Sequence, residues 1–216
     1  MDTKIITISR QCGSGGHLIG EIVARELGIP FYDKALVKEV ANRSGFSEEV
    51  IESKGEDIRR SFLFNIAPYG FSPANTDTRE RLPLSDQIHA YQTEVIRDLS
   101  EKGPCVIVGR CADYILRHRD DVLHVFIYGK FEDRVARVIR THEVAAEEAS
   151  AHVTERDKKR ARYYKQMTNR TWAEAYNYNL CLDVSWLGIR RCADMVVQAY
   201  RAGHTEGVDP LDYLPE

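Results

Sequence analysis

A glycine-rich segment near the start of the chain carries the clearest chemical signal. Residues 9–16 read Ser-Arg-Gln-Cys-Gly-Ser-Gly-Gly and lie between a short apolar run and a helical period. Glycines at such a turn let backbone N–H groups approach an anion without a Cβ in the way, and the helix N-terminus adds about half a positive charge. We therefore expect a phosphate site. It is formed by Gly13, Ser14, Gly15, Gly16 and His17.

The segment departs from the usual phosphate-binding pattern Gly-x-x-x-x-Gly-Lys-Ser/Thr. With Gly15 at the second glycine, Gly16 stands in place of the lysine and His17 in place of the Mg²⁺-binding hydroxyl. Since those two groups normally touch the β/γ-phosphates and Mg²⁺, either neighbours take over their roles or the loop lacks activity. Arg10, at the first glycine, is the favoured substitute cation, with a surface charge as the alternative. Ser14 or Ser9 could supply the hydroxyl for the Mg²⁺ that accompanies ATP.

Arg110 is the second candidate cation. It follows the apolar run 105–108 and Gly109, where a buried strand of a parallel sheet is expected to end. Open α/β sheets collect ligands at the carboxyl ends of their strands, and a planar guanidinium suits a phosphate. The alternative is an arginine that pairs with Asp113 to hold the turn, and Asp113 itself is interpreted as structural.

The elements that must position these residues alternate along the chain. Short apolar runs typical of buried strands alternate with helical periods, which indicates parallel strands joined by helical crossovers. The predicted class is α/β, a P-loop NTPase-type parallel sheet flanked by helices in three layers. Strands are expected at about 4–9, 30–32, 105–108, 122–128 and 180–184. The main helices are expected at about 16–27, 85–102, 131–141, 145–164 and 189–200.

We expect one domain over residues 1–202. Residues 47–82 form an irregular, arginine-bearing insertion with helical parts, and residues 203–216 a polar tail. Of the 216 residues, 43% are hydrophobic, enough for one core. A net charge of −3 argues against a nucleic-acid partner. The apolar run 5–8 is too short for a membrane span, so we expect a cytoplasmic protein with no membrane partner. The oligomeric state stays open, with a homo-oligomer among the alternatives.

Five scattered cysteines without a Cys-x-x-Cys pair and seven dispersed histidines give no protein-ligated metal site.

The strongest resemblance to a known family lies in residues 6–16 and in Leu-Gly-Ile-Pro-Phe-Tyr-Asp-Lys at 27–34. These segments resemble the cytidylate kinase-like branch of the nucleoside-monophosphate kinases. Residues 105–113, 156–164 and 178–182 agree with it, so the resemblance spans about residues 3–200. It implies a P-loop fold, a nucleotide site, ATP and Mg²⁺ as cofactors, and small-molecule nucleotides as partners.

The basic helix at 145–164 is interpreted as the lid of such a kinase. Few acidic residues lie near its basic residues, apart from Glu155 and Asp157. Positioned positive charge is most of what phosphoryl transfer requires, so Arg156 and Arg160, one turn apart on one face, are expected at the transferring group. A solvated charged face is the alternative. The cations of the helix are Arg156, Lys158, Lys159, Arg160 and Arg162.

The acceptor side is expected just beyond the second strand, where the resemblance places groups that face the acceptor nucleotide. A carboxylate at Asp33 could orient a hydroxyl or a Mg²⁺-bound water, or simply cap the following helix. Lys34 and Lys38, nearly one turn apart, could face the acceptor phosphate or be ordinary exposed lysines.

Three functions remain in competition. The leading hypothesis is an enzyme, a kinase that transfers phosphoryl from ATP to a nucleoside monophosphate, CMP or dCMP first, with Arg10, Arg110, Arg156 and Arg160 as its catalytic cations. The second is a nucleotide-binding sensor that kept the glycine cradle without catalysis, because Gly16 and His17 replace the lysine and the hydroxyl. The third is a kinase for another small metabolite, based on the irregular segment 47–82.

Overall fold

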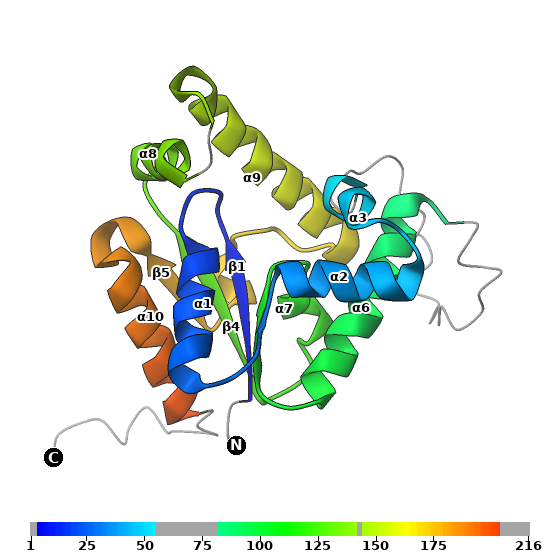
Figure 1. The fold of residues 1–216 in the computed structure, drawn as a ribbon. Coiled ribbons are helices and arrows are strands. Elements are labelled where there is room, and N and C mark those ends of the chain that lie inside the picture. Colours follow the sequence, from blue (N-terminus) through cyan, green and yellow to red (C-terminus); the bar gives the residue numbers. More distant parts are fainter. Residues whose placement is uncertain (1–3, 55–81, 142–143, 204–216) are drawn as a thin grey trace, which may run out of the picture.

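A five-stranded parallel sheet forms the centre of the protein, as seen in a computed structural model that describes residues 4–54, 82–141 and 144–203 (Figure 1). The strand order is β2-β3-β1-β4-β5, and every neighbouring pair is parallel. Helices cover both faces, so the predicted three-layer α/β class is confirmed. The strands are β1 (Ile5–Arg10), β2 (Phe31–Tyr32), β3 (Cys105–Val108), β4 (Val122–Tyr128) and β5 (Leu180–Asp183).

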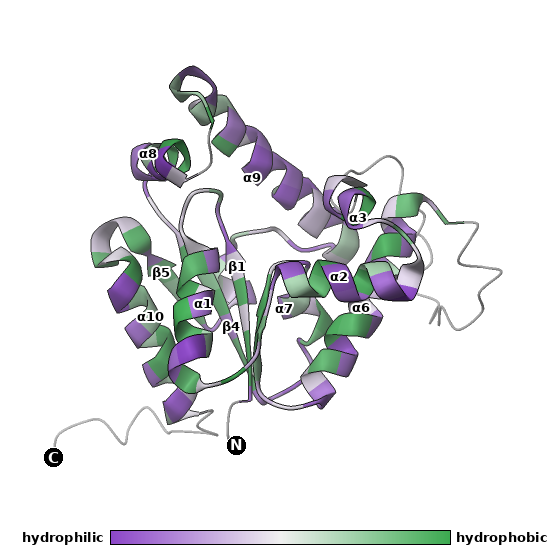
Figure 2. Ribbon diagram, in the orientation of Figure 1, coloured by the Kyte–Doolittle hydropathy of each residue, from purple (hydrophilic) through white to green (hydrophobic). Residues whose placement is uncertain are grey.

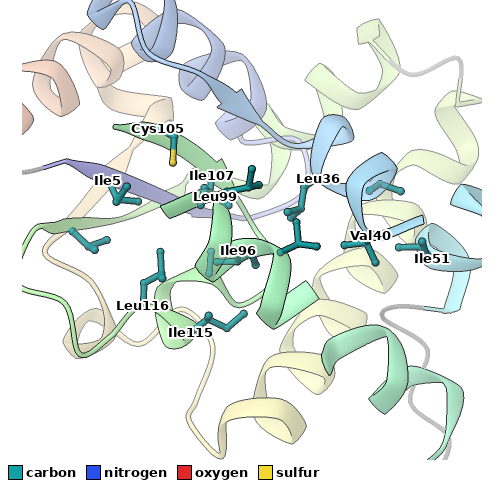
Figure 3. Close-up of a cluster of buried hydrophobic side chains, with 14 of the residues drawn as sticks. Ile5, Leu36, Val40, Ile51, Ile96, Leu99, Cys105, Ile107, Ile115 and Leu116 are labelled. Carbon is teal, nitrogen blue, oxygen red and sulfur yellow. The ribbon is translucent and has the colours of Figure 1, made fainter. Parts of the chain in front are cut away.

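The central strands are apolar because they are covered on both faces. Alternate residues of β1 point to opposite sides: Ile6 and Ile8 pack with the helices α1 (Gly16–Leu27) and α10 (Val184–Ala202). Ile5 packs on the other side with the helices α2 (Lys34–Ser44), α3 (Glu48–Lys54), α6 (Leu84–Glu101) and α7 (Ala112–Ile115). Figure 3 shows this second cluster. Leu36 and Ile96 from two of its helices reach the sheet near Ile107.

Strand register brings three chain segments to one edge of the sheet. Arg10 at the end of β1 is level with Ile127 of β4, and Tyr32 at the end of β2 is level with Ile107 of β3. Because all strands run in the same direction, the segments that follow β1, β2 and β3 leave the sheet at the same edge. The glycine segment, Asp33 and Arg110 therefore emerge as neighbours.

Two further helices lie beyond this carboxyl edge, α8 (Phe131–Thr141) and α9 (Ala146–Thr168) (Figure 1). Most of α9 is hydrophilic (Figure 2). Its apolar contacts near the N-terminus are made by Val153, which packs with Val138 of α8 and with Cys12. Near its C-terminus, Tyr163 donates a hydrogen bond to Gln92 Oε1 at 2.9 Å. The helix is thus anchored at both ends.

Two helix boundaries differ from the expectation. The helix α9 continues to Thr168, past the predicted end near residue 164. The closing helix spans Val184–Ala202 but is interrupted at Gly188, whose φ of 77° is not helical. The predicted helix from about Ile189 is the part after this kink, and the turn at 184–187 before it was not predicted. No helix in the described ranges is long and apolar enough to cross a bilayer. Most of the predicted insertion at 47–82 and the tail at 203–216 lie outside the described residues.

Candidate active site

The glycine segment forms a tight loop between β1 and α1. Gly13 and Gly15 have φ of 73° and 79°, in the left-handed region that glycine adopts without steric cost. A Cβ on Gly13 would collide with the backbone carbonyl of Arg134, and one on Gly15 with the side chain of Ile189. Close packing as well as backbone conformation therefore requires glycine at both positions. Gly15 is the N-cap of α1, so the loop leads straight into the positive end of that helix.

Arg10 explains the glycine that stands where a lysine is usual. A Cβ on Gly16 would lie 2.6 Å from Arg10 Cβ and 2.8 Å from its Cγ. Further along, the guanidinium of Arg10 lies against Gly109, where a Cβ would force it to move. The Arg10 side chain thus extends from the start of α1 to the end of β3, which places its charge between the loop and the turn that carries Arg110.

Helix α8 contributes two arginines to the loop. Arg134, which is 7% exposed, donates from Nη1 to the carbonyl of Cys12 and from Nε to that of Gly129, both at 3.0 Å. Arg137 donates from Nη1 to the carbonyl of Gly13 at 2.9 Å. The same Nη1 lies 3.6 Å from the point where a Cβ on Gly15 would stand. Burial, and secondarily the charge of Arg140, lowers the pKa of Arg137, although an arginine stays charged. A fixed cation therefore lies against the loop.

Helix α9 is tied to the loop by one carboxylate and one arginine. Asp157 accepts the backbone N–H of Cys12 at 2.7 Å and the Nη1 of Arg134 at 2.7 Å. Arg160 donates to the carbonyl of Arg10 at 3.1 Å, and its Nη1 lies 3.9 Å from Asp157 Oδ1. Loop, α8 and α9 therefore form a single charge-assisted network.

Arg110 has a strained backbone and an unused donor. Its φ is 55°, unusual for a residue with a side chain. Its Nη1 is buried without a hydrogen-bond partner among the described residues, as is Nε of Arg160. Asp113, the predicted alternative partner, accepts instead the hydroxyl of Tyr164 at 2.6 Å. Because a buried donor without a partner is costly, the orientation of Nη1 of Arg110 fits a site completed by an anionic ligand.

His17 and Asp33 form a pair on the other side of the loop. Nδ1 of His17 lies 2.5 Å from Asp33 Oδ2, and the imidazole meets the ring of Phe31 edge-on, with centroids 5.3 Å apart. Asp33 occupies the N-cap position of α2 without a side-chain capping bond, so its carboxylate serves His17 and not the helix. Lys34 and Lys38 are exposed on the first turns of α2.

Residues 5–186 match the cytidylate kinase-like family. The chain belongs to this family. No curated protein matches it. Among solved structures, this cytidylate kinase-like protein is similar to an uncharacterized protein from Eubacterium ventriosum, with 25% identity, a TM-score of 0.67 and coverage of 91% of this chain and 97% of that one. It shares its fold with the shikimate kinase from Acinetobacter baumannii in complex with shikimate, with 14% identity, a TM-score of 0.50 and coverage of 91% and 92%.

The predicted site residues of this cytidylate kinase-like protein fall into two groups. Arg10 and Arg160 lie at the loop, Arg110 follows the neighbouring strand β3, and His17 contacts Asp33. The side chains of Arg156, Lys34 and Lys38 are exposed, and the charge of Arg156 acts on the thiol of Cys12 in the loop. The fully buried Ser14 donates its hydroxyl to the carbonyl of Gln11 at 2.9 Å. Within the described ranges, no cluster of three His, Cys, Asp or Glu side chains could hold a metal ion.

Three residues of the network were not predicted, Arg134, Arg137 and Asp157. The sequence could have indicated Arg134 and Arg137, because arginines three apart on a helix share a face and this helix begins just after the carboxyl end of β4. The role of Asp157 has no such signal, since it depends on how α9 packs on the loop. What the assembled site offers chemically is the positive end of α1 and several fixed guanidinium groups, an environment suited to a polyphosphate.

Proposed function

We propose that this protein transfers the γ-phosphoryl group of ATP to a small-molecule acceptor. The observation that carries the proposal is Arg137, which lies against the phosphate loop with its Nη1 on the carbonyl of Gly13. A lysine is missing from the loop itself, and we assign its role to Arg137, which brings a positive charge to the loop from α8. Family membership supports the same reaction class, and it makes the nucleoside monophosphates CMP and dCMP the first acceptors to test.

Each part of the site takes a role in this reaction. The loop N–H groups and the α1 N-terminus bind the donor phosphates, and Arg137 balances their charge. Arg10 lies between the loop and the end of β3, on the route from donor to acceptor. Arg110 and Arg160, each with a buried nitrogen unpartnered among the described residues, bind the oxygens of the transferring or accepting group. Mg²⁺ bound to ATP would neutralise charge that develops between the β- and γ-phosphates.

The test measures ADP formation from ATP and Mg²⁺ with a panel of nucleoside monophosphates. Arg137→Ala is compared with Arg140→Ala, which removes an exposed arginine from the same helix. We expect kcat/KM for ATP to fall about 10²-fold in the first variant and to stay unchanged in the second, since one donor aimed at developing charge is worth about that much. Equal activity in both variants would contradict the role of Arg137.

A nucleotide sensor is the second candidate, and one observation favours it. The hydroxyl of Ser14 is buried and already bonded to Gln11, so the loop offers neither a lysine nor a free hydroxyl at its usual places. A sensor would be stabilised by ATP against thermal unfolding and would form no ADP with any acceptor. An enzyme would form ADP in an acceptor-dependent manner.

A further inference from the structure

The pair formed by His17 and Asp33 has the geometry of a proton-accepting dyad. The Nδ1–Oδ2 distance of 2.5 Å requires a proton between the two atoms. A carboxylate partner fixes that proton on Nδ1, which leaves Nε2 of a neutral imidazole as an acceptor. The Asp33 side chain is 23% exposed and that of His17 51%, so the imidazole is held from one side and accessible from the other.

The dyad lies where the donor and acceptor sides of the site meet. His17 is the second residue of α1, directly after the loop, and Asp33 follows β2. The pairing of β2 with β3 places Asp33 beside the end of β3 at Val108, which Gly109 and Arg110 follow. A nucleophile bound between Arg110 and the loop would therefore be next to His17.

Other charged groups on the surrounding elements are exposed and of both signs. They are Glu21, one turn further along α1, and Lys34, Lys38 and Glu39 on α2, while Arg10 lies at the base of the loop. Among the contacts of the described residues, Asp33 provides the carboxylate bonded to the imidazole. The positive and negative charges of these neighbours largely cancel at the imidazole. Asp33, which is bonded to the ring, is therefore the group that sets the orientation of His17.

We infer that His17, oriented by Asp33, accepts the proton of a hydroxyl group on the phosphoryl acceptor. This rests on the proposed phosphoryl transfer and narrows its acceptor. The acceptor O–H bond breaks, and its proton goes to Nε2. The freed oxygen forms a bond to the γ-phosphorus, the bond from that phosphorus to the β,γ-bridging oxygen breaks, and ADP leaves. The imidazolium then returns its proton to water.

The dyad selects between two acceptor classes. A phosphate monoester has its second pKa near 6 and is largely deprotonated at neutral pH, so a nucleoside monophosphate accepts phosphoryl without a base. An alcohol keeps its proton and benefits from a base by roughly 10²–10⁴-fold. With Arg110 available for a negative group, the structure favours an acceptor that carries both an anionic group and a hydroxyl.

The experiment follows transfer of label from [γ-³²P]ATP to two acceptor panels. One contains CMP, dCMP, UMP and AMP, and the other contains hydroxy acids and sugar phosphates such as glycerate and ribose 5-phosphate. His17→Gln keeps an N–H that can reach Asp33 but lacks a base, Asp33→Asn removes the orienting carboxylate, and His118→Gln changes an exposed histidine elsewhere as a control.

We expect labelled product from the second panel. In His17→Gln, kcat should fall roughly 10²–10⁴-fold with KM for ATP nearly unchanged. The rise of kcat/KM with pH on its acidic limb should disappear, because that limb requires a neutral imidazole. Free imidazole should partly restore His17→Ala, a rescue that a merely structural role would not give. Asp33→Asn should lower kcat less and alter the same limb, and the control should behave as the parent protein.

Two results would overturn the inference and are distinguishable from each other. Labelled nucleoside diphosphates formed at the same rate by His17→Gln and the parent would reject the dyad while leaving phosphoryl transfer intact. Label in neither panel would reject the proposed transfer itself, and the proton acceptor with it.

Discussion

The carboxylate of Asp157 on α9 accepts a hydrogen bond from the backbone N–H of Cys12 in the glycine loop, at 2.7 Å. The two residues are 145 positions apart in the chain. A charged acceptor on a backbone N–H makes a stronger bond than a neutral one. The bond therefore couples the position of the predicted lid helix to the shape of the loop.

Removal of this carboxylate should destabilise the protein. In Asp157→Ala, Arg134 stays buried without its ionic partner, and breaking a buried pair in this way costs about 3 kcal/mol. Urea unfolding measures the change in free energy. The matched control is Glu155→Ala, whose partner Lys158 is exposed, and there we expect less than about 1 kcal/mol. Similar losses in the two variants would show that the contact with the loop adds nothing.

Alanine substitutions at Gly13 and Gly28 distinguish the cost of a packing clash from the cost of a left-handed backbone conformation. Both have positive φ, but a Cβ on Gly28 meets nothing within 4 Å, whereas one on Gly13 collides with the Arg134 carbonyl. Gly28→Ala should cost about 1 kcal/mol for its left-handed conformation. Gly13→Ala should cost about 2–4 kcal/mol because overpacking is added, and it should abolish stabilisation by ATP in a thermal melt. Retained ATP binding in Gly13→Ala would argue against this loop as the phosphate site.

Replacement of Arg110 should lower activity without lowering the stability of the fold. Its buried Nη1 is unpartnered among the described residues, so Arg110→Met should leave the free energy of unfolding unchanged or raise it by about 1 kcal/mol. Activity should fall about 10²-fold, as expected for a cation aimed at the transferring group. Arg119→Met is the contrast, because it breaks two hydrogen bonds to Asp121 and should lower stability without affecting activity. A clear loss of stability in Arg110→Met would indicate a structural arginine.

Asp113 should make stability fall as the pH rises. Burial raises the pKa of Asp113 from 3.8 to about 6, and the hydrogen bond from Tyr164 offsets part of that rise. Between those values the folded state binds more protons than the unfolded state. The resulting stability, about 2–3 kcal/mol, is therefore complete below the unfolded value and lost as the pH passes the folded one.

The measurement compares the parent with Asp113→Asn, which can still accept the Tyr164 hydroxyl. Burial lowers the pKa of His89 and of His124 to about 4, and these two groups give the opposite slope, so that stability rises with pH. The difference between the two proteins from about pH 4 to 7 isolates Asp113. We expect the stability of the parent relative to the variant to decline over this range, and a constant difference would contradict the raised pKa.

Much of the fold could be predicted because its signals are local. The apolar runs that became β3 and β4 and the helical period of α1 have the predicted bounds. The start of α10 was predicted late, because the kink at Gly188 interrupts the periodicity that reveals a helix. Asp33 shows the limit of such reasoning: as a residue type at a helix start it indicates a cap, but its carboxylate finds a stronger partner in His17 across the space between β2 and α1.

The sequence by itself determined the parallel α/β class, the glycine loop and the absence of its lysine and hydroxyl, since periodicity and glycine placement act over a few neighbouring residues. The tertiary structure decided which charges reach the loop. Arg137 and Asp157 form hydrogen bonds to the loop backbone, while the side chain of Arg156 is exposed. That choice depends on how α8 and α9 pack beyond the sheet edge, and the burial and hydrogen bonding between distant segments that fix this packing have no counterpart in local sequence.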